Sequence, residues 1–216
     1  MKRRIQGWLW NRGALELRGR YRRLAGALLG DTLDILNRAG IAYHLDYGTL
    51  LGVVRDGDLI PWDGDLDIGV AAPDWPALEA TFAAFRKCGW RVPHDLSAMP
   101  ADGPGWRAGA PRRLTIVSRI QLPFSIGRIR LDVAAKYAAG DHLWWFLDGN
   151  LCRAPRTFFE GRREIAFEGR AARIPAAAED YLALIYGDWR TPRRDYVAHR
   201  DDGTALGGGA GNGAGR

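Results

Sequence analysis

The sequence predicts an α+β fold in which a small mixed sheet is flanked by helices. Three observations support this prediction: the helical spacing of leucines in residues 14–39, the strand-like alternation in residues 65–70, and the order helix, strand, turn, strand, helix, strands, helix along the chain. The 216 residues suffice for one domain with a small appendage, and a composition of 47% hydrophobic and 26% charged residues is typical of a globular protein.

The first half of the chain supplies the elements around an acidic strand. Residues 14–39 are expected to form a helix, because apolar side chains recur there at near-helical spacing. Residues 41–47 follow as a strand that ends at Gly48, and residues 49–54 as the first turns of a short helix. The acidic strand itself covers residues 65–70, where apolar and acidic side chains alternate.

The middle of the chain adds a helix and a pair of strands. Residues 74–88 have an apolar helical face, and residues 90–92 are expected to form a strand. Residues 97–111 are rich in Gly, Pro and Ala and therefore predict a loop. Residues 113–122 and 127–137 are expected to pair as strands that turn near residues 123–127.

The last third is less regular. Residues 144–146 form an aromatic cluster without a clear structural preference, whereas residues 157–159 and 164–167 resemble another strand pair. Residues 175–186 are expected to form a helix that begins at a proline and ends at a glycine. The glycine-rich residues 207–216 are of low complexity, which predicts a disordered tail.

Charge and cysteine usage limit the classes of partner and compartment. A formal net charge of +6 and a pI of about 9.7 favour an anionic partner, such as a nucleotide, a phosphorylated glycan, nucleic acid or an acidic membrane surface. Cys88 and Cys152 lie far apart in the sequence without a nearby His/Cys cluster, which argues against a structural zinc site and a disulfide scaffold. A reducing compartment, and hence a cytoplasmic location, is the simplest interpretation.

The N-terminal segment MKRRIQGWLWNRG combines basic residues with tryptophans. Its apolar stretch is too short and too broken for a signal peptide, and no run in the chain approaches the ~18 apolar residues of a membrane span. The segment could lie at the inner membrane surface as a peripheral contact, or it could be an N-terminal helix that packs on the domain.

The motif GTLLGVVRDGDLIPWDGDLDIGV, residues 48–70, is the most informative part of the chain. Asp63, Asp65 and Asp67 occupy alternate positions, so on a strand their carboxylates point to one face. Carboxylates held this close repel each other unless a cation lies between them, and hard oxygen ligands suit Mg²⁺ or Mn²⁺. The alternative is a solvated edge strand with an acidic outer face.

A third carboxylate from a neighbouring strand would complete such a metal site. Asp132 is the best candidate, because in the segment IRLDV the apolar Ile129, Leu131 and Val133 point to the opposite face. The alternative for Asp132 is a surface residue paired with an arginine.

Three further residues are candidates for phosphate binding. Gly48 and Thr49 would let the backbone approach a phosphate closely, and N–H groups at the start of the following helix could bind its oxygens. Arg55 is placed to reach a phosphate or an acceptor, and its alternative is a solvated loop arginine.

These motifs resemble the LicD-type family, which includes fukutin and fukutin-related protein and is similar to the wider nucleotidyltransferase fold shared with DNA polymerase β. Three blocks carry the resemblance: residues 48–70, the segment IRLDVAAKY and the segment FEGRAARIPAAAEDYLALIYGDWRTP. We therefore expect a LicD-like catalytic domain over residues 41–200, preceded by an N-terminal helical segment over residues 1–40, of which residues 1–13 lie outside the resemblance. The resemblance also implies that Asp65, Asp67 and Asp132 are the metal-binding and catalytic residues.

The family resemblance implies transfer of a phosphate-linked group, phosphocholine or a polyol phosphate, from a CDP-activated donor to a glycan or glycolipid hydroxyl. Mg²⁺ or Mn²⁺ on the aspartates would bind the donor diphosphate, CMP would leave, and no specific nucleic acid is expected as a partner. If choline is transferred, some tryptophans could form an aromatic cage, namely Trp62, Trp90, Trp106, Trp144 and Trp145. Two alternatives stay open: nucleotidyl transfer from a nucleoside triphosphate with release of pyrophosphate, and a non-catalytic protein that binds an anionic polymer.

Overall fold

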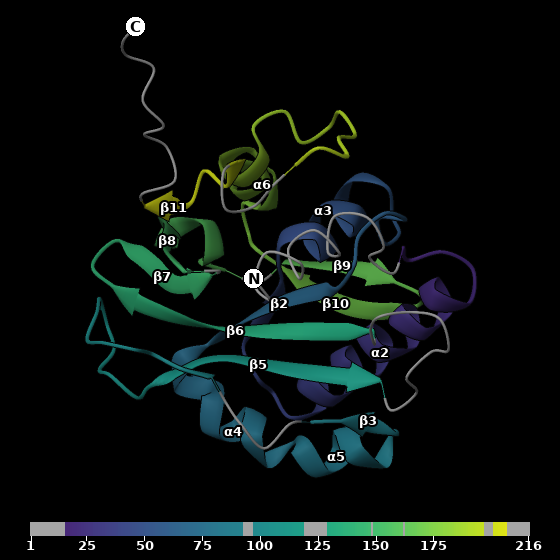
Figure 1. Cartoon of the computed structure of the whole chain (residues 1–216), viewed down its shortest axis with the longest axis horizontal. Coiled ribbons are helices and arrows are strands. Elements are labelled where there is room, and N and C mark those ends of the chain that lie inside the picture. Colours follow the sequence, from purple (N-terminus) through teal and green to yellow (C-terminus); the bar gives the residue numbers. More distant parts are fainter. Residues whose placement is uncertain are drawn as a thin grey trace, which may run out of the picture.

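The computed structural model describes residues 16–92, 97–118, 129–147, 149–161, 163–196 and 201–206. These residues form a nine-stranded mixed sheet, a separate two-stranded hairpin and helices that pack around them (Figure 1). The predicted α+β architecture is therefore confirmed. Among the described residues, no helix combines the length and apolar character that crossing a bilayer requires.

The sheet is organised around one long strand, β6. Its strands are β1 (Tyr43–Leu45), β2 (Leu66–Ala71), β3 (Trp90–Arg91), β4 (Ser97–Ala98), β5 (Pro111–Ser118), β6 (Arg130–Ala139), β7 (His142–Leu147), β8 (Asn150–Pro155) and β11 (Ala205–Leu206). β6 pairs with β2 in parallel and with β5 and β7 in antiparallel orientation. Because β5 and β7 pair with different parts of β6, this strand links both wings of the sheet.

Helices lie on both sides of this framework. Their bounds are α2 (Arg20–Arg38), α3 (Tyr47–Arg55), α4 (Trp75–Ala80), α5 (Phe82–Lys87) and α6 (Ala178–Tyr186), with 3₁₀ turns at η1 (Ala72–Asp74) and η2 (Arg156–Phe159). α2 contacts β6, α5 and the hairpin of β9 (Arg163–Phe167) and β10 (Arg170–Ile174), whereas α3 contacts β2 and α6. In Figure 1, α3 and α6 lie above the strands β2, β6 and β5, whereas α4 and α5 lie below them.

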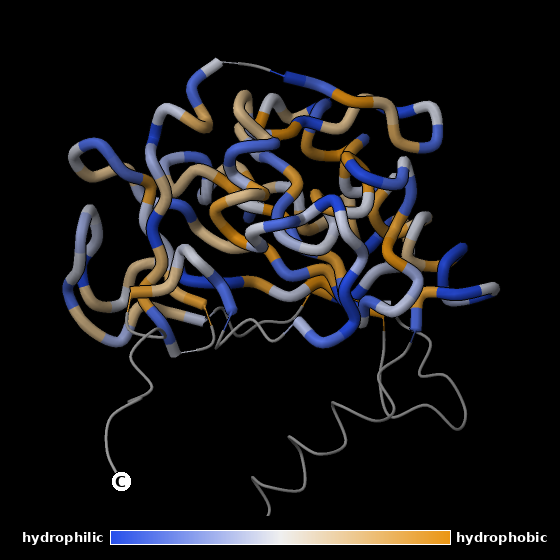
Figure 2. Tube along the Cα trace, turned by 90° about the horizontal axis from the view of Figure 1, so that it is seen from above, coloured by the Kyte–Doolittle hydropathy of each residue, from blue (hydrophilic) through white to orange (hydrophobic). Residues whose placement is uncertain are grey.

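The core forms because β2 and β6 each bury alternate apolar side chains. Leu66, Ile68 and Val70 of β2 are no more than 1% exposed, and Leu131 and Val133 of β6 are fully buried. Apolar segments accordingly run through the middle of the molecule and polar ones follow its edges (Figure 2). The opposite face of the same two strands is consequently available for polar groups.

Several predicted boundaries are wrong. The first helix begins at Arg20, because Glu16–Gly19 are not helical and Gly19 has a positive φ of 53°. The helix predicted over residues 74–88 is split into α4 and α5 at Thr81, whose hydroxyl donates a hydrogen bond to the Leu78 carbonyl. The aromatic residues 144–146, to which the sequence analysis assigned no element, belong to a regular strand, β7 (His142–Leu147).

The strand predicted at residues 157–159 is also wrong, since this segment is the 3₁₀ turn η2. β9 pairs instead with β10 across a two-residue turn at Glu168-Gly169. Both turn residues have positive φ, 47° and 76°, which is the geometry of a tight hairpin turn.

α3 begins two residues earlier than predicted, at Tyr47. Asp46 is its N-cap, and the Asp46 carboxylate accepts a hydrogen bond from the Tyr47 backbone N–H at 3.1 Å. Gly48 and Thr49 therefore lie in the first turn of a helix, and Gly48 is not the residue that ends a strand.

A buried ion pair joins this helix start to the long strand. The Nζ of Lys136 in β6 lies 2.6 Å from the Oδ2 of Asp46, and both residues are no more than 2% exposed. Burial alone would raise the pKa of Asp46, but the Lys136 charge, together with His44 and the hydrogen bonds to the carboxylate, holds this pKa below its ordinary value. Gly69 leaves room for the Lys136 stem, since a Cβ there would overlap it.

Aromatic side chains complete the surroundings of the ion pair. The Lys136 ammonium lies 3.4 Å from the centre of the buried Trp145 ring, and Tyr181 of α6 donates a hydrogen bond to Asp46 at 2.8 Å. Trp145 also donates to the Tyr47 hydroxyl, which in turn donates to Asp202 near the C-terminal strand β11. The network thus ties α3, α6, β6, β7 and the chain before β11 to one buried charge pair.

Three predictions lie outside the described residues: the membrane or packing role of the N-terminal segment, the turn at residues 123–127 and the disorder of the tail 207–216.

Replacement of Lys136 tests the importance of this ion pair for stability. We expect Lys136→Met to lower the free energy of unfolding by about 3–5 kcal/mol in urea denaturation, because it leaves the Asp46 carboxylate buried without its cation. The exposed Lys87 on α5 provides a matched control, and Lys87→Met should have an effect within about 0.5 kcal/mol. Equal stability of the two variants would contradict a structural role for the pair.

Candidate active site

Asp67 and Asp132 lie directly opposite each other on the parallel strands β2 and β6. Thr115 of β5 is the register partner of Asp132 on its other side, so the three residues form one row across three strands. Asp65 immediately precedes β2, two residues before Asp67. The fold thus brings together the three aspartates that the sequence analysis selected, although Asp132 comes from a segment 65 residues further along the chain than Asp67.

The start of α3 holds β2 in place beside this row. The Thr49 hydroxyl accepts a hydrogen bond from the Asp67 backbone N–H at 2.8 Å, and the Asp67 carbonyl accepts one from the Asp46 N–H at 3.0 Å. Thr49 is 1% exposed. In this arrangement Thr49 positions the acidic strand, and its contact with a phosphate stays a prediction.

Gly48 lies against the Asp63 side chain. A Cβ at position 48 would overlap the Asp63 carboxylate, so glycine is required for this close approach. The same carboxylate accepts a hydrogen bond from the Gly64 N–H at 2.8 Å. In this structure the space beside Gly48 is therefore occupied by the Asp63 carboxylate. Binding of a phosphate at Gly48 stays a prediction.

The carboxylates perturb each other's protonation. Burial and the neighbouring Asp65 raise the pKa of Asp63 to about 7. Burial, followed by the charges of Asp65 and Asp132, raises the pKa of Asp67 well above its ordinary value. This concentration of negative charge costs free energy in the isolated protein, and a cation would relieve the cost.

Two arginines that the sequence analysis did not select flank the acidic row. Arg130, at the start of β6, forms an ion pair with Asp65 at 2.5 Å, and Arg113 of β5 lies 3.6 Å from Asp132. Thr115 donates a hydrogen bond to the other oxygen of Asp132. The available sequence signal was the alternation itself, since Arg130 and Asp132 share a strand face and Arg113 and Thr115 share the face of the adjoining strand.

The donor set is chemically suitable for a divalent ion, but its side chains are not gathered around a common point. Within the described ranges, no three or more His, Cys, Asp or Glu side chains form a group that could hold a metal as they stand. Arg130 binds Asp65, while Thr115 and Arg113 contact Asp132. Asp67 and Asp132 present hard oxygen ligands from adjacent strands. Burial and the charges of Asp65 and Asp132 raise the pKa of Asp67, so a cation would stabilise its ionised form. Metal binding therefore fits these residues and stays a prediction.

Arg55 has protein partners in this structure. Its guanidinium donates two hydrogen bonds to Asp56 at 2.9 and 2.7 Å and a longer one to the Trp189 carbonyl. The side chain is 8% exposed, so it is neither solvated nor in a loop but lies in the last turn of α3. Contact of Arg55 with a donor phosphate stays a prediction.

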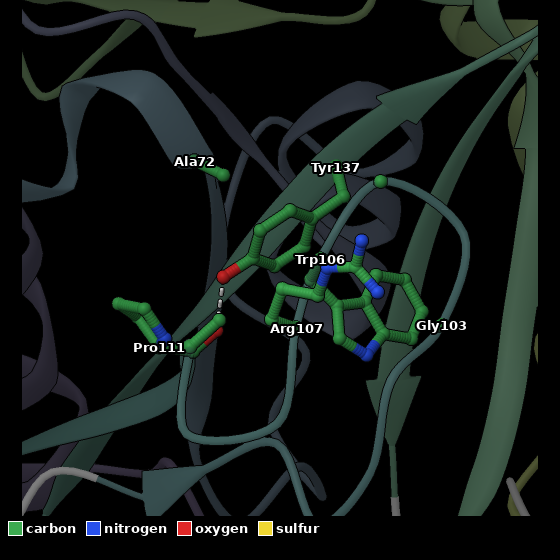
Figure 3. A pocket seen from close by; sticks show the side chains of 8 residues that line it. Ala72, Gly103, Trp106, Arg107, Pro111 and Tyr137 are labelled. Carbon is green, nitrogen blue, oxygen red and sulfur yellow. Dashed lines mark hydrogen bonds between the residues drawn. The ribbon is translucent and has the colours of Figure 1, made fainter.

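A cavity of about 670 Å³ lies elsewhere on the molecule. Trp106, Arg107, Pro111 and Tyr137 are among its lining residues, and the Tyr137 hydroxyl donates to the Pro111 carbonyl (Figure 3). Tyr137 is five residues beyond Asp132 on β6, about 16 Å along the strand and on its other face. This cavity is therefore separate from the row of aspartates.

The tryptophans proposed for an aromatic cage are dispersed over the fold. Trp90, Trp106 and Trp145 are at most 9% exposed and belong to β3, to the loop before β5 and to β7, respectively. Trp62 is half-buried, and the guanidinium of Arg194 lies 4.7 Å from the centre of its ring. These four rings consequently lie in separate elements of the fold and do not form one cage in this structure.

Comparison with known families identifies a match that covers well over half of the chain. The model for the LicD family, described as the LicD/FKTN/FKRP nucleotidyltransferase domain, matches residues 40–177. This range contains the three aspartates and both flanking arginines.

Curated relatives match over shorter regions. The ribitol 5-phosphate transferase FKRP of Homo sapiens is 50% identical over 42 residues, which are 19% of this chain and 8% of that protein. The ribitol-5-phosphate transferase FKTN of Homo sapiens is 26% identical over 126 residues, 57% of this chain and 23% of that protein. The chain spans about a quarter or less of the length of the first curated relatives that it matches.

Among solved structures, ANT(2'')-Ia in complex with adenylyl-2''-tobramycin aligns with 80% of this chain and 80% of that chain. The TM-score is 0.46 and the sequence identity is 16%.

The crowded carboxylates predict a distinctive pH dependence of stability. The folded-state pKa of Asp63 is about 7, above its ordinary value of 3.8, so the folded protein binds more protons than the unfolded chain between these values. Ionisation of Asp63 therefore destabilises the fold as the pH rises from about 4 to 7. In the presence of a chelator, we expect the difference in melting temperature, Asp63→Asn minus the unmodified chain, to be larger at pH 8 than at pH 5, because only the unmodified chain is destabilised by ionisation at this position.

Added Mn²⁺ should reverse this loss, with a larger rise in melting temperature at pH 8 than at pH 5. Asp180→Asn, on the exposed side of α6, is the matched control and should leave the pH profile unchanged. If the melting temperatures of Asp63→Asn and the unmodified chain change equally with pH, ionisation of Asp63 does not destabilise the fold and the prediction is wrong.

Proposed function

The chain belongs to the LicD family, and we propose that it catalyses metal-dependent transfer of a phosphate-linked small group from a CDP-activated donor to a glycan or glycolipid hydroxyl. The observation that carries the proposal is the placement of Asp67 opposite Asp132, with Asp65 two residues away, inside the matched family domain. The relatives FKRP and FKTN are ribitol-phosphate transferases, which supports a phosphate-linked group as the transferred unit.

Mg²⁺ or Mn²⁺ would be held by Asp65 and Asp67, with Asp132 as a further ligand. When bound, such an ion supplies positive charge that offsets the donor diphosphate and the charge developing on the leaving oxygen. Binding would require Asp65 to exchange its contact with Arg130 for the ion. The parallel pairing of β2 and β6 supplies the alignment of the carboxylates before any ligand binds.

The reaction itself is a displacement at phosphorus. The acceptor oxygen forms a bond to the phosphorus that carries the small group, and the bond from that phosphorus to the bridging oxygen breaks. The bridging oxygen keeps the electron pair and leaves as part of CMP, while the acceptor proton passes to a carboxylate. Asp132 is our candidate for this proton acceptor, and the hydrogen bond from the Thr115 hydroxyl to one of its oxygens supports the assignment.

The donor is identified by a binding experiment with matched ligands. We propose thermal-shift titration with CDP-choline, CDP-ribitol, CDP-glycerol, CTP and ATP, each with and without Mn²⁺. A metal-dependent shift with one CDP-linked compound supports the proposal and identifies the head group. A shift with triphosphates alone would favour nucleotidyl transfer with pyrophosphate release, and no shift at all would favour a non-catalytic protein.

Replacement of Asp67 separates catalysis from folding. We expect Asp67→Asn to reduce CMP release by on the order of 100-fold or more, because a charged group aligned with the reacting phosphates is lost. Without metal, the same variant should melt no lower than the unmodified chain, since repulsion from Asp65 and Asp132 is relieved. Asp141→Asn, at an exposed turn, is the control. Near-normal CMP release by Asp67→Asn would exclude the proposed role.

A further inference from the structure

We propose that Arg113 and Arg130 form a pair of guanidinium groups that binds the diphosphate of the donor. This inference rests on the proposed function, because it assigns the ligand of the same site. It replaces the expectation that phosphate binding relies mainly on the first turn of α3 and on Arg55.

The two arginines occupy equivalent positions on either side of the acidic row. Arg130 lies two residues before Asp132 on β6, and Arg113 is the register partner of Ala134, two residues after it. Their side chains reach the sheet face that carries the aspartates, as their contacts with Asp65 and Asp132 show. A ligand bound by Asp67 and Asp132 would consequently have a guanidinium on each side.

Both groups remain accessible while they contact the carboxylates. The side chain of Arg130 is 29% exposed and that of Arg113 is 35% exposed. The planar guanidinium forms paired hydrogen bonds with phosphate oxygens as readily as with carboxylates. No refolding of the strands is needed for either side chain to change partner.

The exchange of partners follows from the charges at the site. Four carboxylates, those of Asp63, Asp65, Asp67 and Asp132, lie near two guanidinium groups. A divalent ion that binds Asp65 and Asp132 replaces the arginines as the counter-charge of these carboxylates. The released guanidinium groups would then face the anionic oxygens of a diphosphate bound to the same ion.

Two other arginines, Arg112 and Arg55, have protein partners away from the acidic row, so diphosphate binding is assigned to Arg113 and Arg130 alone. Arg112, adjacent to Arg113 on β5, donates a hydrogen bond to the Ser97 hydroxyl at 2.7 Å and lies over the Phe146 ring. Arg55 is bound to Asp56 and the Trp189 carbonyl. Because side chains alternate along β5, Arg112 is a matched control on the other face of the same strand.

The test measures ligand affinity by calorimetry, with CDP and inorganic pyrophosphate as probes in the presence of Mn²⁺. We expect Arg113→Gln and Arg130→Gln each to weaken both probes by about tenfold or more, since each removes a charge-assisted contact. Affinity for Mn²⁺ alone should be unchanged or higher, because a competing cation has been removed from Asp65 or Asp132. Arg112→Gln should bind both probes like the unmodified chain.

Further variants guard against a purely structural effect. Arg130→Lys keeps the charge but loses the planar fork, and we expect an affinity between those of the unmodified chain and Arg130→Gln. Unchanged CDP and pyrophosphate affinity in both Gln variants overturns the inference, and so does an equal loss in Arg112→Gln. If pyrophosphate binding depends on the arginines but no CDP-linked compound binds, the inference stands and the proposed donor is wrong.

Discussion

The buried ion pair between Lys136 and Asp46 is the interaction on which the arrangement of the site depends. Lys136 lies four residues after Asp132 on β6, and Asp46 begins α3 while its backbone N–H donates to Asp67. This ion pair therefore links β6, which carries Asp132, to the start of α3, where the Asp46 backbone is hydrogen-bonded to Asp67. Such a pair is costly to desolvate, and its value lies in tying these elements to a single arrangement.

This rigid framework holds an acidic row that is unfavourable on its own. Burial of the carboxylates and their mutual repulsion both raise the pKa values of Asp63 and Asp67. Arg113 and Arg130 offset part of the charge in the free protein. The same imbalance would favour the divalent ion and the anionic donor proposed above, and in that case stability and binding would depend on the same groups.

The sequence alone was sufficient for the fold class and for membership of the LicD family. It also selected three aspartates that the fold places at neighbouring positions, and their catalytic role stays a prediction. The signals were local: helical spacing in α2, alternation in β2 and the aspartate of the apolar strand β6. Local signals failed where non-local contacts decide the outcome. The 3₁₀ turn at residues 156–159 has strand-like residue types, but β9 is paired by β10 through the turn at Glu168-Gly169.

What the sequence determined by itself is which residues carry charge and which strand face each occupies, because alternation along a strand is a property of the backbone. Which charges meet was decided only by the tertiary structure. The register between β2, β6 and β5 places Asp67, Asp132 and Thr115 in one row with an arginine on each side. Likewise, the sequence around Lys136 predicts an ordinary strand lysine, and only the tertiary structure brings Asp46, at the start of α3, and Tyr181 of α6 together with it in a buried cluster. Pairing register depends on contacts between distant segments, for which a single sequence holds no direct physical signal.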